Sequence, residues 1–307
     1  MSAALIELEQ VSKTFSTRQG PVKAMDDVSF AVREGDVFGL LGPNGAGKST
    51  TLRAILMLTR IDGGLLRVLG RERPDRRTFF SQAAYLPEEP QLFPGATGRE
   101  HLQYFGRLCG MCGPDLNARV KEVLALVSLG DAGQRPIATY SKGMKQRIGI
   151  AAAILHRPRI VFLDEPTRGL DPVGRREVRD LLQRLADEGV TLFLNSHLLG
   201  EVERLCNRVV ILDRGQVRGG GLLSELLTVN ESIEVRFALP ADADPTMVAS
   251  SLPADGGLRK AVVDDTRALA ELTGRIAAAG GRVVSAQAAR LELEDYFLRV
   301  VKEGEET

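Results

Sequence analysis

A glycine-rich segment with a single lysine is the first part of the sequence that could do chemistry. It fits the pattern G-x-x-x-x-G-K-[ST] of phosphate-binding loops, and it consists of Gly42, Pro43, Asn44, Gly45, Ala46, Gly47, Lys48, Ser49 and Thr50. Glycines let successive backbone N–H groups turn inward around an anion, and a following helix adds its positive end. Lys48 would reach the β- and γ-phosphates of a nucleotide, and the Ser49 hydroxyl would ligate Mg²⁺. The alternative is an ordinary glycine-rich turn, but the apolar run before the segment and the helical run after it favour phosphate binding.

Two adjacent carboxylates form a second candidate. Asp164 and Glu165 follow the apolar run 160–163. A buried strand delivers such residues to the carboxyl edge of a sheet, where phosphate loops also lie. Asp164 would hold Mg²⁺, directly or through water, and Glu165 would polarise an attacking water molecule. An acidic turn is the alternative, and the phosphate loop upstream favours the catalytic interpretation.

The elements that must position these residues are short apolar strands separated by helices. Continuous apolar runs alternating with amphipathic stretches indicate a parallel sheet covered on both faces. The runs are 37–41, 160–163, 191–194 and 209–212. In the opening runs 5–8 and 28–32, apolar and polar residues alternate instead. This pattern favours an antiparallel sheet with one face exposed to solvent.

The character of the chain changes near residue 231. An alternating strand, a turn, a helix that stops at two glycines, a short strand and a last helix are expected. Their ranges are 232–237, 239–245, 268–279, 282–285 and 291–301. We therefore predict an α/β fold with two domains. Residues 1–228 form a P-loop nucleotidase core with an antiparallel β subdomain and a helical subdomain, and residues 231–307 form a small α+β accessory domain.

Composition narrows the class of protein. Lysine plus arginine total 40 and aspartate plus glutamate also total 40, so the net charge is zero. A protein that coats nucleic acid needs a basic surplus, so no nucleic-acid partner is expected. No stretch approaches the ~18–20 apolar residues of a membrane span, and the N-terminus lacks a secretory pattern. Three cysteines make no disulfide framework. A cytoplasmic protein is expected.

Three further segments identify a family. Tyr140–Arg147 precedes the carboxylate pair, Gly169–Pro172 follows it, and Asn195–His197 ends the next strand. With the phosphate loop, in this order and spacing, the sequence resembles the nucleotide-binding subunits of ATP-binding cassette (ABC) transporters over residues 4 to 225. It is most similar to stand-alone ATPase subunits of exporters that move drugs, antibiotics, lipids or polymers.

The resemblance implies roles for individual residues in a site that binds ATP and Mg²⁺. Phe15 lies where an aromatic ring stacks on adenine. Glu88 lies where a side chain senses Mg²⁺ and the membrane partner. Ser141 and Gly143 belong to the signature segment, which contacts the γ-phosphate bound by the opposite subunit.

Two more residues receive roles in the same way. Asp171 belongs to a loop that runs between two sites, and His197 contacts the γ-phosphate and the attacking water. Because each site is built from both subunits, the resemblance implies a homodimer. It also implies an integral membrane permease, to which the chain binds at the inner face of the cell membrane.

The sequence departs from the family pattern at two motifs. The common signature LSGGQ is replaced by YSKGM, with Lys142 for the first glycine and Met144 for the glutamine. Glu88 replaces a glutamine, so it adds negative charge beside the γ-phosphate. The hydrophobic run 92–95 lies where the family receives the permease, and core packing is its alternative.

The function expected is an ATPase subunit that powers export. Two alternatives stay open. A soluble member of the family acting on ribosomes or DNA would usually carry two cassettes or a long coiled coil, and an import ATPase would usually carry a C-terminal β-barrel.

Overall fold

The computed structural model describes residues 4–18, 20–72, 74–240, 252–253 and 258–303. The chain divides into two compact units, which are described separately. Unit 1 comprises the described residues of Met1–Leu223 and Arg299–Thr307, and unit 2 comprises those of Ser224–Leu298. No helix among the described residues is long and apolar enough to cross a membrane.

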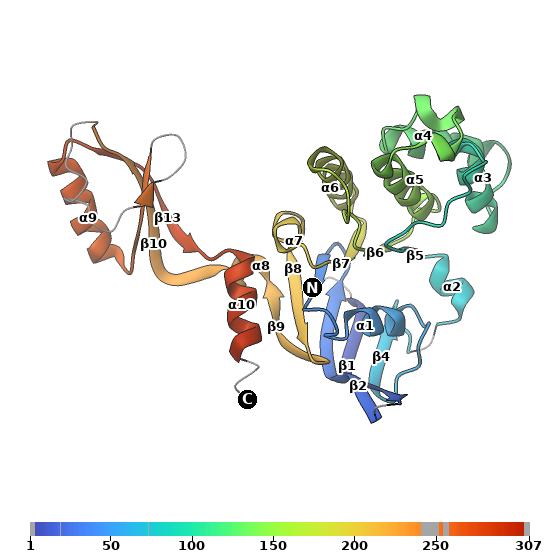
Figure 1. Ribbon diagram of the computed structural model, residues 1–307, viewed down its shortest axis with the longest axis horizontal. Coiled ribbons are helices and arrows are strands. Elements are labelled where there is room, and N and C mark those ends of the chain that lie inside the picture. The colour runs from blue at the N-terminus through green and yellow to red at the C-terminus, as the bar shows by residue number, and fades with distance from the viewer. Residues whose placement is uncertain (1–3, 19, 73, 241–251, 254–257, 304–307) are drawn as a thin grey trace. The chain divides into compact units, whose positions relative to one another are not determined.

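The centre of unit 1 is a sheet of six described strands (Figure 1). In spatial order they are β5 (Ala83–Leu86), β6 (Ile160–Asp164), β7 (Thr191–Asn195), β3 (Val37–Leu41), β8 (Arg208–Asp213) and β9 (Gln216–Leu222). The first five run parallel, and β9 returns antiparallel to β8. Because parallel strands end at one edge, the residues that follow β3, β6 and β7 are brought together. Asp164 stands opposite Asn195 in the register.

A second sheet of unit 1 is antiparallel, with the order β2-β1-β4. Its strands are β1 (Ala4–Thr17), β2 (Gly20–Arg33) and β4 (Gly63–Val68). Both sheets share one hydrophobic core with α1 (Lys48–Ile55), in which Phe38, Phe162 and Phe193 are fully buried. β1 and β2 extend well beyond the short runs expected from the sequence, because register shifts let a long strand pair continue through positions that break the alternation.

The remaining helices of unit 1 are mostly set by caps visible in the sequence. They are α2 (Arg76–Phe80), α3 (Gly98–Leu108), α4 (Gly113–Leu126), α5 (Lys142–Ile154), α6 (Pro172–Asp187) and α7 (Leu199–Leu205). Thr97 and Glu100 form a capping box on α3. Ser141 caps α5, and Asp171 caps α6. The helices α3, α4 and α5 lie together as a helical group (Figure 1), as the predicted fold class requires.

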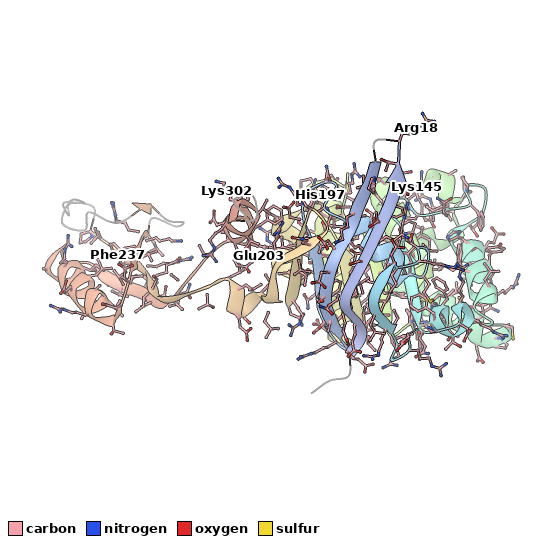
Figure 2. All side chains as sticks on the ribbon, turned by 90° about the horizontal axis from the view of Figure 1, so that it is seen from below. Arg18, Lys145, His197, Glu203, Phe237 and Lys302 are labelled. Carbon is pink, nitrogen blue, oxygen red and sulfur yellow. The ribbon has the colours of Figure 1, made fainter. Side chains whose placement is uncertain are left out.

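Unit 2 is a small antiparallel sheet with one helix packed on it. The strands β11 (Leu252–Pro253), β12 (Arg259–Val263), β10 (Thr228–Ala238) and β13 (Arg282–Arg290) lie in this order. The helix α9 (Thr266–Ala278) closes a core that contains Phe237, which Figure 2 labels, and Ile276. The short α8 (Leu223–Leu226) and the terminal α10 (Leu293–Glu303) each include residues of both units. The expected α+β character is confirmed, and most of the turn predicted over 239–245 lies outside the described residues.

Candidate functional site

The phosphate loop connects β3 to α1 with backbone shapes that only glycine accepts easily. Gly42, Gly45 and Gly47 have φ values of 150°, 82° and 100°. A Cβ on Gly42 would lie 2.2 Å from a backbone oxygen of Leu212, and one on Gly47 would lie 2.3 Å from that of Ala24. The loop therefore packs against β8 and β2. Both conformation and space favour glycine at positions 42 and 47, and conformation alone favours it at position 45.

Lys48 is the buried cation of the loop, with 9% of the residue exposed. Its Nζ donates to the carbonyl oxygens of Gly42 at 2.7 Å and Pro43 at 3.0 Å. Burial lowers the pKa of Lys48, and the charges of Glu165 and Asp164 oppose that shift. The ammonium therefore lies within electrostatic reach of both carboxylates, as the two motifs predicted.

A cavity of about 400 Å³ opens over the loop. It is lined by the chain from Asn44 to Thr50 and by Val22, Lys23, Ala24 and Arg214. Phe15 pairs with Val22 across the β1–β2 register, which places the aromatic ring near the cavity's β2 wall. The ring is 40% exposed, and the Lys13 ammonium lies 5.3 Å from its centroid.

Asp164 is held through both of its carboxylate oxygens. Asn195 Nδ2 donates to Oδ1 at 2.7 Å, and the Tyr85 hydroxyl donates to Oδ2 at 3.3 Å. Burial raises the pKa of Tyr85 to about 12, with Asp164 adding to the shift, so the phenol remains a donor at neutral pH. Asn195 is 3% exposed, and its Oδ1 has no hydrogen-bond partner among the described residues.

Glu165 and His197 form a close pair beside these groups. His197 Nδ1 lies 2.6 Å from Glu165 Oε1, which also accepts the backbone N–H of His197 at 3.1 Å. The Ser196 hydroxyl donates to Oε2 at 3.3 Å. The Glu165 side chain is 11% exposed, whereas that of His197 is 49% exposed. Glu165 has a left-handed φ of 48°, an unfavourable conformation for a residue other than glycine, and such outliers gather at functional sites.

The oxygen groups present fit a magnesium ion. Ser49 follows Lys48 at the start of α1, and Asp164 lies within the electrostatic reach of Lys48. No group of three acidic, histidine or cysteine side chains that could hold a metal occurs in the described part of the chain. Mg²⁺ would therefore need the hydroxyl of Ser49 and phosphate oxygens in addition to the carboxylate, which is its usual set beside a nucleotide.

Glu88 lies in an ion pair. Its Oε1 accepts a hydrogen bond from Arg168 Nη1, and both side chains are partly exposed. The structure thus brings Glu88 to the loop that follows β6, where Arg168 lies.

Ser141, Gly143 and Asp171 lie at the starts of α5 and α6. Ser141 Oγ accepts from the N–H of Met144, and Asp171 Oδ1 accepts from the N–H of Gly174 at 2.8 Å. Their described contacts are with the helical group and α6 rather than with the phosphate loop of the same chain. A Cβ on Gly169 would lie 2.2 Å from Lys142 Nζ, so the lysine of the altered signature rests against the segment 167–171.

The sequence interpretation assigned no role to four side chains of the site: Tyr85, Arg168, Asn195 and Ser196. Asn195 had a usable signal, because it ends an apolar strand as Asp164 does. Tyr85 and Arg168 had none, because their contacts depend on β5 lying next to β6.

Comparisons with known proteins agree with this geometry. The ABC transporter family model matches residues 25–168. A protein of Synechocystis sp. named as an uncharacterized ABC transporter ATP-binding protein is 36% identical over 99% of this chain and 86% of its own length. A daunorubicin resistance ATP-binding protein of Streptomyces coeruleorubidus is 35% identical over 92% of this chain and 89% of its own length.

Two solved structures are similar to unit 1. One is an ATP-binding subunit of an ABC transporter, 32% identical with a TM-score of 0.64, covering 72% of this chain and 91% of that chain. The other is a dimeric bacterial ABC transporter cassette, 25% identical with a TM-score of 0.63, covering 71% of this chain and 98% of that chain.

Proposed function

The chain belongs to the ATP-binding subunits of ABC transporters and is an ABC ATPase, and from that premise we propose that it powers export through a separate membrane permease. The observation that carries the catalytic part is the contact of Glu165 with His197 beside the buried Lys48. The resistance protein of Streptomyces coeruleorubidus supports the direction of transport.

Nucleotide binding is the task of the phosphate loop. Its inward N–H groups and the N-terminus of α1 hold the phosphates, and Lys48 exchanges its two carbonyl contacts for phosphate oxygens. Phe15 stacks on the base. Ser49 and Asp164 hold Mg²⁺, which supplies charge neutralisation on the phosphate oxygens. Tyr85 and Asn195 fix the Asp164 carboxylate for this purpose.

Hydrolysis is assigned to Glu165 with His197. Glu165 accepts a proton from a water molecule whose oxygen attacks the γ-phosphorus, and the bond from that phosphorus to the bridging oxygen of ADP breaks. His197 orients the Glu165 carboxylate through Nδ1, and its half-exposed ring can also reach the γ-phosphate. The backbone strain at Glu165 is consistent with a carboxylate aimed by its surroundings.

The signature residues act on a second copy of the chain in this proposal. Ser141 and Gly143 contact the γ-phosphate held by the opposite subunit, and Asp171 lies between the two sites. The similar bacterial cassette whose structure is dimeric supports this arrangement. ATP closes the homodimer, and hydrolysis reopens it.

The permease is proposed to dock where apolar side chains are exposed near Glu88. Phe93, Tyr104 and Leu108 are 44%, 48% and 66% exposed, and exposed apolar side chains are what a docking surface offers. A cavity of about 710 Å³ between the ends of α2, α3, α4 and α5 includes Leu108. Docking here would place the chain at the inner face of the membrane. Residues 231–307 are proposed as an accessory domain that supports the homodimer, regulates turnover or contacts the permease, and deleting them while measuring dimerisation and ATPase activity distinguishes these roles.

The decisive experiment compares transport in two orientations of membrane vesicle. The chain is co-expressed with a candidate permease, and daunorubicin serves as the first probe. Export predicts ATP-dependent daunorubicin uptake into inverted vesicles, and Lys48→Ala should abolish it. Uptake that occurs only in right-side-out vesicles would indicate import. A chain that does not co-purify with the permease would favour a soluble role.

A further inference from the structure

We propose that Arg168 is a positioning residue for this site: it is the counter-ion that lets Glu88 lie beside a bound triphosphate without repelling it. The inference rests on the proposed function, because it concerns nucleotide binding and turnover at the same sheet edge. Arg168 lies between the carboxylate pair and the segment Gly169–Pro172.

The contact joins two neighbouring loops of the central sheet. β5 and β6 pair in parallel, with Leu86 opposite Leu163, so the chains that follow them leave the sheet side by side. Glu88 is on the first of these chains and Arg168 on the second, 80 residues later. Their hydrogen bond joins Arg168 Nη1 to Glu88 Oε1.

The main chain around Arg168 is well fixed. Its N–H donates to the carbonyl oxygen of Glu165 at 3.0 Å. Thr167 and Leu170, on either side, are 5% and 6% exposed. The Arg168 guanidinium therefore extends from a hydrogen-bonded turn that begins at Glu165. The position of this turn brings the guanidinium within contact of Glu88.

The charge of Glu88 reaches the site itself. Both Glu88 and Asp164 contribute to the raised pKa of Tyr85, whose hydroxyl bonds Asp164. Asp164 in turn interacts with Lys48. An uncompensated Glu88 would thus place a third carboxylate near Asp164 and Glu165, where a triphosphate must also bind. Arg168 cancels that charge at short range.

A second cation limits where Arg168 can go. Lys142 Nζ lies against Gly169, the next residue, whose φ of 66° and lack of a side chain make room for it. Repulsion from this ammonium disfavours a guanidinium turned toward α5 and leaves Glu88 as its anionic contact. The two departures from the family pattern, Glu88 and Lys142, thus meet on the same turn.

The test is a charge-rescue cycle in the full-length chain. Arg168→Gln, Glu88→Gln and the double variant are compared by calorimetric titration with ATP in EDTA and with MgATP. Arg168→Gln should weaken ATP binding by about two- to fivefold at low salt, as expected for a partly exposed pair. Glu88→Gln alone should bind ATP at least as tightly as the native chain. The double variant should recover the native affinity, because the net charge of the pair is again zero, and the loss in Arg168→Gln should shrink at high salt.

Arg176→Gln is the matched control, because Arg176 is 77% exposed on α6 and pairs with Asp180 on its own helix. It removes one positive charge from the chain without touching Glu88, so ATP affinity should be unchanged. Thermal unfolding of every variant separates a loss of binding from a loss of fold.

Two results would overturn the proposal. A double variant as weak as Arg168→Gln would mean that Arg168 contacts the nucleotide directly or acts through the fold. Native affinity in Arg168→Gln would mean that the pair does not influence the site. Either result leaves the proposed function intact, provided that the native chain binds and hydrolyses ATP and Lys48→Ala does not.

Discussion

Unit 1 and unit 2 handle buried polar groups in opposite ways. At the sheet edge of unit 1, Lys48, Thr167, Asn195 and Ser196 are all less than 10% exposed. Among the described residues of unit 2, Glu234 is the only buried polar residue. It is neutralised within its own sheet by Lys260 at 2.7 Å and Arg236 at 2.9 Å.

The two units differ in how much hydrogen-bonding capacity their buried polar groups leave unused. Burying a polar group costs free energy unless a partner compensates it. Most buried polar groups in proteins are therefore hydrogen-bonded. Glu234 is fully paired, which is typical of a structural role. In unit 1, by contrast, Asn195 Oδ1 has no described partner and Lys48 bonds only carbonyl oxygens. The edge of unit 1 is therefore arranged for a ligand, and the sheet of unit 2 for stability.

The largest expected effect comes from Glu165→Gln, which should remove turnover and spare binding. The amide keeps the shape of the side chain but cannot accept the proton of the attacking water. We expect kcat to fall by about 10²–10⁴ while ATP affinity stays within a few fold, measured by phosphate release and calorimetric titration. Asp180→Asn, on the exposed face of α6, is the control. A turnover near the native rate would remove Glu165 from the role of base.

Lys48→Ala should weaken ATP binding and leave the fold intact. A charge-assisted hydrogen bond to phosphate contributes about 1.5–3 kcal/mol, so affinity should fall roughly 10- to 100-fold. Because burial already lowers the pKa of Lys48, removing the ammonium should not lower the melting temperature. Lys121→Ala, an exposed change on α4, should alter neither quantity. An unchanged dissociation constant for ATP would contradict the phosphate-loop assignment.

Glu234→Gln should have the opposite effect to Lys48→Ala: it should destabilise unit 2 and leave ATP affinity unchanged. Hydrogen bonding to Lys260 lowers the pKa of Glu234 against the opposing effect of burial, and Arg236 adds to the lowering. The native ion pairs therefore stabilise the fold above the pKa of a free glutamate, about 4.3. That stabilisation is lost as the pH falls through the lowered value.

Urea unfolding at several pH values measures this effect. The variant should lose about 1–2 kcal/mol near pH 7 and converge on the native chain once the pH lies below the lowered pKa of Glu234. A loss of ATP binding in Glu234→Gln would contradict the division of roles between the two units.

The residues nearest to the chemistry were predictable from the sequence because single motifs contain them. Lys48 and Ser49 share one loop, and Asp164 and Glu165 end one strand, so the spacing along the chain fixes their proximity. The buried strands 37–41, 160–163, 191–194 and 209–212 were also predictable, because both of their faces are apolar.

What could not be predicted depends on which strands are neighbours. The order β5-β6-β7-β3 decides that Tyr85 and Asn195 flank Asp164 and that Arg168 meets Glu88. Hydrophobic periodicity gives a strand its faces but not its neighbours. β9 and its antiparallel pairing with β8 were missed for a related reason, since the glycines 219–221 within it weaken the strand signal.

The smallest expected effect comes from Tyr85→Phe. This variant tests whether the hydrogen bond from Tyr85 helps to hold the Asp164 carboxylate in position for Mg²⁺. The change removes the hydroxyl that donates to Asp164 Oδ2 and keeps the ring in place. Asn195 still holds Oδ1, so the carboxylate should be loosened rather than lost. We expect the Mg²⁺ concentration for half-maximal ATPase to rise about two- to tenfold, the equivalent of one ordinary hydrogen bond. ATP affinity in EDTA should be unchanged, because the phenol contacts no other part of the proposed nucleotide site. Tyr104→Phe, on exposed α3, is the matched control and should leave the Mg²⁺ requirement unaltered. A native requirement in Tyr85→Phe would show that Asn195 alone positions Asp164, and that the partly buried phenol is structural in the way that Glu234 is in unit 2.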